Sequence, residues 1–447
     1  MSPLKQKTAD VAGMFYPADP QTLRNQILAF QNFSLPLCSC ESRAVIIPHA
    51  GYVYSGQLAA SALQYLDKNA ANIFIFAPAH RIPLEGIAVC DYDAFETPLG
   101  TLAVNCEICD RLRKDFGCKL SSEAFSGEHA VEVQLPMLQM HLPGAKIIPL
   151  VVGDTAHSTV CEILEKFWED RKNAFIISSD LSHFHSCEEA AEIDSTTCNM
   201  IENCATEDFS FDRACGATAI RGLMDFTAKK GFSLQRVGTH NSGDTSGDRN
   251  RVVGYGAWIL SEVGMNKFIK NYFSDEVISI CHGSIESALR GEDFTPPNIR
   301  PPLEQLGASF VTLKIHGDLR GCIGSIRAYQ PLISDLIQNA RSAAFRDSRF
   351  SPLTGEEFAN IDIHVSLLSH PRKIAFKCEK DLLDAITPNL DGIIIRDGIF
   401  QAVYLPSVWE QLPDKNEFLA SLKLKAGLPR NHFSGTLEAF KFSCENI

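Results

Sequence analysis

The sequence lacks a long apolar run, because none of its 447 residues falls in an uninterrupted apolar stretch of 18 residues. A helix that crosses a membrane needs about that length. The first twenty residues, MSPLKQKTADVAGMFYPADP, also lack the apolar segment of a secretory signal peptide. We therefore expect a cytoplasmic protein that does not bind or cross a membrane.

An excess of positive charge is also lacking. The chain has 41 Lys and Arg residues against 54 Asp and Glu residues, which gives a net charge of −13. Nucleic acids and anionic membranes are bound largely by neutralising their phosphates, so we expect neither as a partner. A phosphate-binding loop is absent too, since GYGAW provides only the weak pattern G-x-G.

Cysteine, in contrast, is abundant, with fifteen residues. Their number is odd and they are scattered through apolar segments, so we expect mostly buried thiols in a reducing compartment. Cys106 and Cys109 form a C-x-x-C without a second pair at zinc-ribbon spacing, and we expect them to share one helix. The C-x-x-x-C-x-x-C loop of radical-SAM enzymes does not occur.

The apolar pattern changes near residue 264. Before it, short apolar runs alternate with amphipathic segments, a pattern typical of an α/β fold with a mostly parallel sheet and flanking helices. After it, alternating strands surround turns at His316-Gly317-Asp318 and Asp397-Gly398, which favours an α+β fold with an antiparallel sheet. We predict domains at 1–264 and 265–447. The four apolar runs are AVIIPHA (44–50), NIFIFAPAH (72–80), AKIIPLVVGD (145–154) and NAFIISSDLSH (173–183).

Histidines follow three of these apolar runs. His49 and His80 each come just after a predicted strand, and Asp180, His183 and His185 follow a third. The carboxyl ends of parallel strands meet at one edge of a sheet, so these residues are expected to converge. Imidazole is a common ligand of transition metals and also titrates near neutral pH. We expect His49, His80 and His183 to be functional, and His185 to point elsewhere.

A third metal ligand is sought among cysteine and carboxylate residues. A helix expected to open after Asp212 places Cys215 in its first turn, where the helix dipole favours a thiolate. The alternative is that Cys215 is only a small buried residue. Glu128 and Asp180 are the carboxylate competitors, and His129 is either an acid/base group or a support for the helix that follows.

With these residues in place, residues 5–262 resemble the Memo family, which is related in fold to class III extradiol dioxygenases. The resemblance implies that His49, His80 and Cys215 bind a redox metal, iron or copper. It also places His183 where the related dioxygenases keep an acid/base histidine. The motifs are VAGMFYP, IIPHAGYVYSG, FAPAHRIPL, GEHAVEVQLP, SSDLSHF, ACGATAI and NSGDTSGDRNRVVGYGA.

One ligand departs from the dioxygenase pattern of two histidines and a carboxylate, because a thiolate replaces the carboxylate. A softer ligand shifts the preference towards copper or zinc, and three protein ligands still leave an open position. We expect a substrate to meet Tyr52, Tyr54, Phe15 and Tyr16.

Residues 266–447 resemble the AMMECR family through LRGCIGSI, AAFRDSRFSPL, VSLLS and the KAGLP tail. Arg320 and Cys322 lie two apart on a predicted strand, so Arg320 either stabilises a thiolate or binds a carboxylate or phosphate beside it. The alternative is that Gly321 and Gly324 permit tight packing and Cys322 fills the core. We expect the segment FRDSRFSPL to form a buried ion pair and a cap rather than a binding site.

The two families occur together, often with a radical-SAM protein, in the AmmeMemoRadiSam system. The resemblance therefore implies a radical-SAM partner and a metal-dependent redox protein, a possible oxidoreductase, acting on an unknown small molecule or peptide. One alternative is a non-catalytic module for protein interaction or substrate delivery. Another is a zinc hydrolase that uses His183 as its acid/base group.

Overall fold

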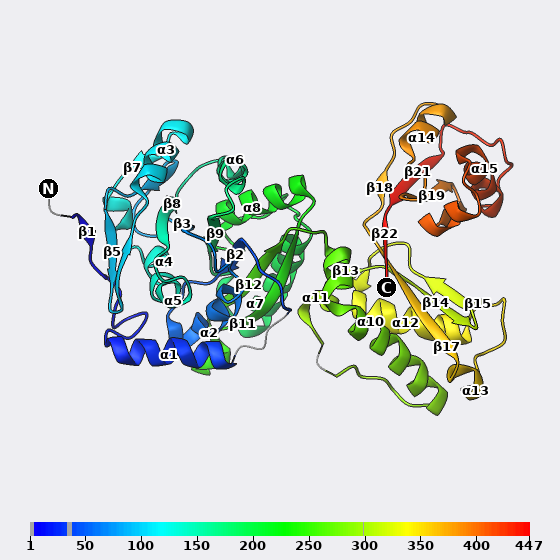
Figure 1. Ribbon diagram of the computed structural model, residues 1–447, viewed down its shortest axis with the longest axis horizontal. Helices are drawn as coiled ribbons and strands as arrows, with labels where there is room; N and C mark the ends of the chain where they lie inside the picture. Colours follow the sequence, from blue (N-terminus) through cyan, green and yellow to red (C-terminus); the bar gives the residue numbers. More distant parts are fainter. Residues whose placement is uncertain (1–3, 34–37, 298) are drawn as a thin grey trace. The chain divides into compact units, whose positions relative to one another are not determined.

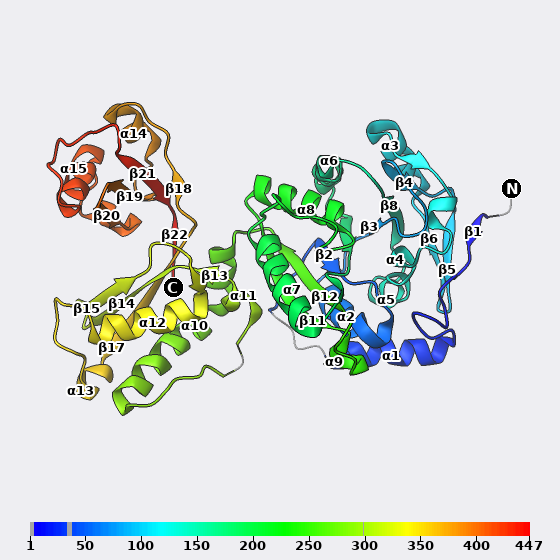
Figure 2. The ribbon, with the colours of Figure 1, turned by 180° about the vertical axis from the view of Figure 1, so that it is seen from behind.

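The computed structural model describes residues 4–33, 38–297 and 299–447. The chain divides into two compact units, residues 1–265 and 266–447, which are drawn in Figures 1 and 2 and described separately below.

Within the described part of unit 1, nine strands form one mixed sheet in the order β10-β12-β2-β9-β3-β8-β4-β7, with β11 also paired to β12. The central strands β2, β9 and β3 are neighbours and run parallel to one another. The bounds are β2 (Ala44–Ile47), β3 (Asn72–Pro78), β4 (Ile87–Val89), β7 (Lys119–Leu120), β8 (Lys146–Val152), β9 (Asn173–Ser178), β10 (His183–His185), β11 (Ser233–Asn241) and β12 (Val252–Ser261).

The four apolar runs form β2, β3, β8 and β9, as predicted. All four residues of β2 and all six of β9 are buried, because both faces of the sheet are covered. Residues of parallel strands that are covered on both sides must be apolar throughout, which explains the continuous rather than alternating pattern.

Helix α1 begins where the sequence provides a cap. Asp19 accepts a hydrogen bond from the Thr22 amide at 2.8 Å, and Pro20 is the first residue of α1. Helices α6 and α8 lie side by side in both views. The bounds are α1 (Pro20–Phe33), α2 (Gln57–Leu63), α3 (Cys106–Phe116), α4 (His129–Glu132), α5 (Leu135–His141), α6 (His157–Trp168), α7 (Cys187–Glu202), α8 (Ala217–Lys230) and α9 (Gly243–Ser246).

Unit 1 also contains a small second sheet, a π-helical turn and most of the cysteines. A small sheet joins β1 (Gln6–Lys7), β5 (Ala94–Thr97) and β6 (Gly100–Ala103). A π-helical turn, Tyr52–Gly56, leads into α2. Cys106 and Cys109 share α3, as predicted, and a disulfide joins Cys38 to Cys40 while the other thirteen cysteines are free.

Unit 2 contains two four-stranded antiparallel sheets, β15-β14-β17-β22 and β18-β21-β19-β20, and the two-stranded β13-β16. This change from a largely parallel to an antiparallel arrangement confirms the predicted fold class. The strand bounds are β13 (Leu306–Gly307), β14 (Ser309–Ile315), β15 (Asp318–Gly324), β16 (Gln330–Pro331), β17 (Ile361–Leu368), β18 (Arg372–Lys373), β19 (Gly392–Asp397), β20 (Phe400–Tyr404), β21 (Glu438–Phe442) and β22 (Cys444–Asn446).

The two predicted turns of unit 2 are hairpins between β14 and β15 and between β19 and β20. Gly317 and Gly398 have φ angles of 89° and 60°, a region that suits glycine. An apolar cluster that includes Phe310, Ile394 and Phe442 joins the two sheets. The helices are α10 (Met265–Arg290), α11 (Pro301–Glu304), α12 (Leu332–Phe345), α13 (Gly355–Phe358), α14 (Glu379–Ala385) and α15 (Lys415–Lys425).

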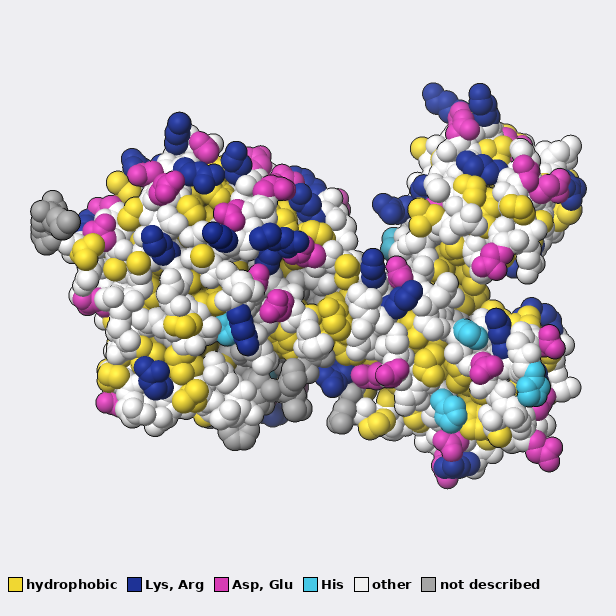
Figure 3. Space-filling view, in the orientation of Figure 1, with side chains coloured by type: hydrophobic (Ala, Val, Ile, Leu, Met, Phe, Trp, Pro, Cys, Tyr) yellow, Lys and Arg dark blue, Asp and Glu magenta, His cyan; other side chains and the backbone are white. Residues whose placement is uncertain are grey.

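The surface of the chain carries mixed charge. On the face drawn in Figure 3, acidic and basic side chains are interspersed rather than gathered by sign. None of the helices in the described part of the chain combines the length and the apolar character needed to cross a bilayer.

Candidate metal centre

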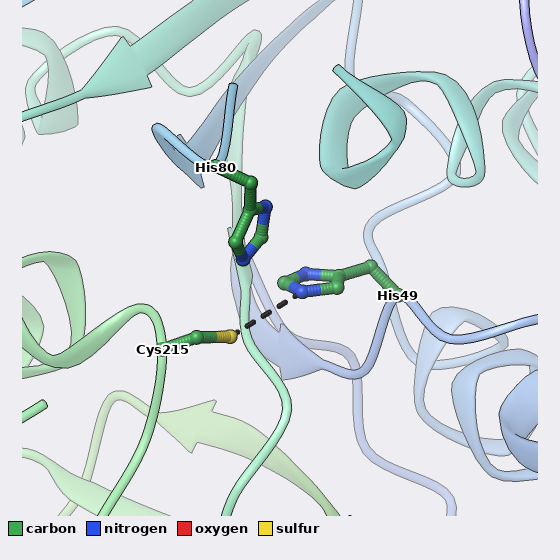
Figure 4. A group of neighbouring side chains, drawn as sticks. All are labelled: His49, His80 and Cys215. Carbon is green, nitrogen blue, oxygen red and sulfur yellow. Dashed lines mark hydrogen bonds between the residues drawn. The ribbon is translucent and has the colours of Figure 1, made fainter. Parts of the chain in front are cut away.

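Three neighbouring parallel strands of unit 1 end at the same edge of the sheet and deliver polar residues there. His49 follows β2 and His80 follows β3, while Asp180 follows β9 between them. Cys215 reaches the same place from the segment before α8. Its sulfur lies 3.3 Å from His49 Nε2, and one ligand atom each from His49, His80 and Cys215 lie within 4.8 Å of one another. Figure 4 shows the three side chains pointing toward one another.

The His49 ring is oriented by a hydroxyl group. Its Nδ1 lies 2.9 Å from Ser178 Oγ, and that hydroxyl donates to the carbonyl of Ala130 at 2.7 Å. The hydroxyl proton is therefore used, so His49 Nδ1–H is the donor and Nε2 has a free lone pair directed toward Cys215. Burial, followed by the neighbouring His80 and His129, holds the pKa of His49 well below its usual value.

The His80 ring is oriented by a carboxylate. Its Nδ1 lies 3.0 Å from Glu128 Oε1, and its amide donates to Glu128 Oε2 at 2.7 Å. Burial alone would raise the pKa of Glu128, but its hydrogen bonds with the His80 side chain and with backbone amides hold that pKa below its ordinary value. Glu128, considered above as a competing ligand, is thus placed as the partner that leaves His80 Nε2 free.

Cys215 lies outside the helix that was expected to contain it. Helix α8 begins at Ala217 with Gly216 at its N-cap, so Cys215 precedes the first turn, contrary to prediction. Burial and the nearby Asp180 carboxyl raise the pKa of Cys215 to about 12, whereas a helix dipole was expected to lower it. The Asp180 amide donates to the sulfur at 3.3 Å. A cation beside the sulfur would lower this pKa and favour the thiolate.

Asp180 and His183 lie next to this centre. Asp180 Oδ1 accepts the His49 amide at 2.9 Å, and Oδ2 is 3.9 Å from His49 Nε2. Burial raises the pKa of Asp180 to about 7. His183 acts electrostatically on His49, and burial lowers its pKa. His185 is directed elsewhere, with a side chain 41% exposed.

His129 stacks on His80, with ring centroids 4.9 Å apart, and meets the His49 ring edge-on at 5.3 Å. Its Nδ1 is buried and hydrogen bonds to no group; Glu128 Oε1 is 3.5 Å away. Burial lowers the pKa of His129 to about 4, so the ring is neutral at pH 7. Phe15 packs against it at 4.7 Å, which brings that predicted residue close to the centre.

The three tyrosines predicted to line the site are placed differently. Tyr16 is buried and donates to Glu132 Oε1 at 2.7 Å, and Tyr52 is buried and donates to the carbonyl of Val133 at 2.9 Å. Burial raises the pKa of both hydroxyls. Tyr54 lies on a separate cavity, where its carbonyl meets His240. One buried hydroxyl binds a carboxylate of the chain and the other binds a backbone carbonyl, which leaves neither available to a substrate.

A cavity of about 850 Å³ opens beside His80 and Cys215. The apolar part of its wall includes Phe211, which is 63% exposed, and residues 82–84. Lys119 lies among acidic lining residues, so no strong charge of one sign is present. We did not predict these residues; the signal available was the aromatic pair of DFSF just before Cys215.

Sequence comparison now identifies both parts of the chain. The family described as Memo-like protein matches residues 7–259, which is more than half of the 447 residues. The chain belongs to the Memo family. The family described as AMMECR1 matches residues 278–447, so a Memo-like domain and an AMMECR1 domain are fused in one chain. Both resemblances drawn from the motifs are confirmed, and Memo family membership indicates a dioxygenase-like fold.

Relatives of the Memo-like domain occur in archaea and bacteria. The chain is 32% identical over 274 residues to a MEMO1 family protein of Methanosarcina mazei, with 58% of this chain and 100% of the relative covered. A MEMO1 family protein of Aquifex aeolicus is 31% identical over 259 residues, covering 55% and 95%. Among solved structures, the uncharacterized protein PH0010 from Pyrococcus horikoshii is 33% identical, covering 38% of this chain and 88% of that one, with a TM-score of 0.37.

In the AMMECR1 domain, Arg320 does not face Cys322. The pairing of β14 with β15 shifts between Leu313–Gly321 and Lys314–Leu319, so Arg320 is an extra, bulged residue and the two-residue alternation is broken. The Arg320 guanidinium instead makes two hydrogen bonds of 2.9 Å with Glu357. The Asp347–Arg349 ion pair, at 2.7 Å, forms as expected.

The Arg320–Glu357 pair predicts an acid-sensitive contribution to stability. Hydrogen bonds from Arg320 and Thr354 lower the pKa of Glu357 to about 2. A depressed carboxyl pKa stabilises the folded state above pH 4.5, and this contribution is lost as the pH falls toward 2. In urea unfolding followed by tryptophan fluorescence, Glu357→Gln should reduce the difference in stability between pH 6 and pH 3. The neighbouring exposed Glu356→Gln is the control; equal effects of the two changes would contradict the assignment.

Proposed function

We propose that the Memo-like domain is a metal-dependent redox protein that holds one transition-metal ion through His49 Nε2, His80 Nε2 and Cys215 Sγ. Iron and copper are the expected metals, with zinc as the alternative. The observation that carries the proposal is the convergence of these three ligand atoms within 4.8 Å, with each imidazole held by a separate partner. Metal-binding histidines are usually oriented in this way by their second ring nitrogen.

The donor set fits such an ion. Two imidazoles and a thiolate suit copper, iron or zinc better than magnesium or calcium. The buried Cys215 thiol and the Asp180 carboxyl beside it are costly to ionise together, and a cation offsets that cost. Three protein ligands leave a coordination position for a substrate or oxidant, which is typical of catalytic rather than structural sites.

When bound, the metal would supply electron transfer and polarise the group that it contacts. The residues around the metal would hold or transfer protons. Asp180 has a pKa of about 7 and so holds or releases a proton near neutral pH. His129 is neutral there, and its Nδ1 makes no hydrogen bond to the described residues. We assign His183 to the same acid/base group because it lies within electrostatic reach of His49.

The cavity beside His80 and Cys215 would admit the substrate. Its apolar wall and mixed charge favour a small, weakly charged molecule or an apolar peptide side chain rather than a polyanion. Phe15 would close the other side of the centre through its contact with His129. A radical-SAM protein remains the proposed partner, because Memo-like and AMMECR1 domains are fused here.

Metal content tests the proposal. The protein should be purified without chelators, both aerobically and anaerobically, and analysed by inductively coupled plasma mass spectrometry. We expect about one iron or copper ion per chain, and a thiolate-to-metal charge-transfer band in the oxidised form. Protein that contains no metal and takes up none would refute the proposal. Bound zinc without redox chemistry would favour the hydrolase alternative, which oxygen-consumption assays would distinguish.

Glu128→Gln should weaken metal affinity by roughly 10–100-fold, because an amide holds the His80 ring less strongly than a carboxylate and makes Nε2 a poorer donor. The measurement is a chelator competition with the anaerobic protein. Glu123→Gln, on an exposed residue five positions earlier, is the matched control and should leave affinity unchanged. Equal affinities for Glu128→Gln and the unmodified protein would show that Glu128 does not orient a ligand.

A further inference from the structure

The two glycines of LRGCIG determine where the Cys322 side chain points. A Cβ on Gly321 would lie 2.1 Å from the carbonyl oxygen of Ala343, so this residue faces α12. A Cβ on Gly324 would lie 2.2 Å from the Phe310 ring, and Phe310 packs in the apolar cluster between the two sheets. Cys322 follows Gly321 and lies two residues before Gly324, so it faces the second sheet rather than α12.

The position of Cys322 is fixed by polar groups around it. Its amide donates to Asp347 Oδ2 at 2.8 Å, and its sulfur accepts a hydrogen bond from Thr312 Oγ1 at 3.2 Å. The guanidinium of Arg349 binds Asp347 and also approaches the Cys322 carbonyl at 3.4 Å. The thiol is partly exposed, and the Arg349 side chain is 53% exposed. The Thr312 hydroxyl therefore adjoins a partly exposed sulfur, and the Arg349–Asp347 ion pair lies beside the Cys322 backbone.

A second cation lies on the side of the second sheet, because Val403, whose carbonyl it binds, packs in the apolar cluster that also holds Phe310. Lys425 is the last residue of α15, and its Nζ donates to the carbonyl of Val403 at 3.0 Å and lies 4.9 Å above the Tyr404 ring. Partial burial lowers the pKa of Lys425, with Cys322 and Arg349 among the groups that act on it electrostatically. No carboxylate in the described ranges forms an ion pair with Lys425. This ammonium therefore has unused capacity to bind an anion.

We propose that Thr312, Cys322, Arg349 and Lys425 form a binding site for a small ligand that carries a carboxylate or phosphate, with the Cys322 sulfur beside the ligand. Two cations from different elements bind the oxyanion, and the Thr312 hydroxyl holds the sulfur in place. The site belongs to the AMMECR1 domain and requires no metal. It replaces the predicted Arg320–Cys322 pair, because the bulge removes Arg320 and the chain brings Arg349 and Lys425 to the thiol instead.

Paired alkylating reagents test the site on the full chain. Iodoacetate carries a carboxylate and iodoacetamide does not, but both react in the same way. The cysteine sulfur forms a bond to the reagent's methylene carbon, iodide leaves with the electron pair, and the thiol proton goes to solvent. Rates at each cysteine are measured by mass spectrometry of tryptic peptides. Exposed Cys378, which has Lys377 beside it in the sequence, is the internal control.

We expect the ratio of iodoacetate to iodoacetamide rates at Cys322 to exceed that at Cys378 by about tenfold or more, since local charge raises the concentration of an anionic reagent. Lys425→Met should bring the Cys322 ratio down to that of Cys378. Lys415→Met, at the other end of α15, should leave it unchanged. Added acetate or inorganic phosphate should slow iodoacetate at Cys322 alone, and the stronger competitor identifies the preferred oxyanion.

Equal ratios at Cys322 and Cys378 would overturn the proposal. So would a Lys425→Met protein whose ratio is unchanged, or a Cys322 that reacts with neither reagent while Cys378 does. None of these measurements involves the Memo-like domain, so failure here would leave the proposed metal centre unaffected. Likewise, finding no metal in the Memo-like domain would not bear on this site.

Discussion

Replacing Cys215 with alanine should lower the affinity of the Memo-like domain for its metal by more than about 100-fold, because partners outside the coordination sphere alone account for roughly 10–100-fold. The sulfur is one of the three proposed ligand atoms that converge here, and it lies 3.3 Å from His49 Nε2. The charge-transfer band of the oxidised protein should disappear as well. Metal content, chelator competition and absorption spectra measure these effects.

Two variants separate ligation from folding. Cys215→Asp supplies a carboxylate and converts the set to the two-histidine, one-carboxylate pattern, so it should retain iron(II) while losing copper(I) and the charge-transfer band. Cys161→Ala, a buried cysteine on α6, should keep the metal. If Cys215→Ala protein bound iron and copper as tightly as the unmodified chain, Cys215 would not be a ligand.

Glu132→Ala should reduce the free energy of unfolding of the Memo-like domain by about 3–5 kcal/mol, the range for removing one partner of a buried ion pair. The Glu132 carboxylate is 1% exposed and accepts hydrogen bonds from the Tyr16 hydroxyl, Lys7 Nζ and two backbone amides. Without it, the buried Lys7 ammonium retains only Asp10 as an ionic partner.

Urea unfolding followed by tryptophan fluorescence measures this change. The stability of Glu132→Gln should fall between those of the unmodified protein and Glu132→Ala, since the amide oxygen still accepts hydrogen bonds but carries no charge to balance Lys7. Glu192→Ala, on the exposed surface of α7, should change stability by less than about 0.5 kcal/mol. A Glu132→Ala protein as stable as the Glu192→Ala control would mean that the network contributes little.

Much of the fold follows from local patterns. The four apolar runs formed the predicted strands because strands covered on both faces must be apolar throughout. The convergence of His49, His80 and Asp180 followed from a single topological rule, since β2, β9 and β3 are parallel neighbours whose carboxyl ends share one edge. The residues that follow a strand were therefore predictable as a group from the strands alone.

The rest depended on long-range contacts. Nothing near Tyr16 in the sequence indicates that Glu132 would accept its hydroxyl, and nothing near His49 indicates Ser178. The expected start of α8 was wrong because Gly216 packs against Ser179, where a Cβ would lie 2.7 Å from the serine side chain; this contact fixes the turn before the helix. The Arg320 prediction failed because alternation along a strand does not reveal a bulge.

The place of β12 in the sheet also affects how the protein is made. Strand β2, at residues 44–47, pairs on one side with β9 and on the other with β12, at residues 252–261. A ribosome releases β2 roughly 200 residues before β12, at about 5–20 residues per second. One edge of β2, the strand that precedes His49, therefore stays unpaired for roughly 10–40 s during synthesis. Cys215 follows His49 by 166 residues, so the three ligands can meet only once residue 215 has left the ribosome, before the AMMECR1 domain has been translated.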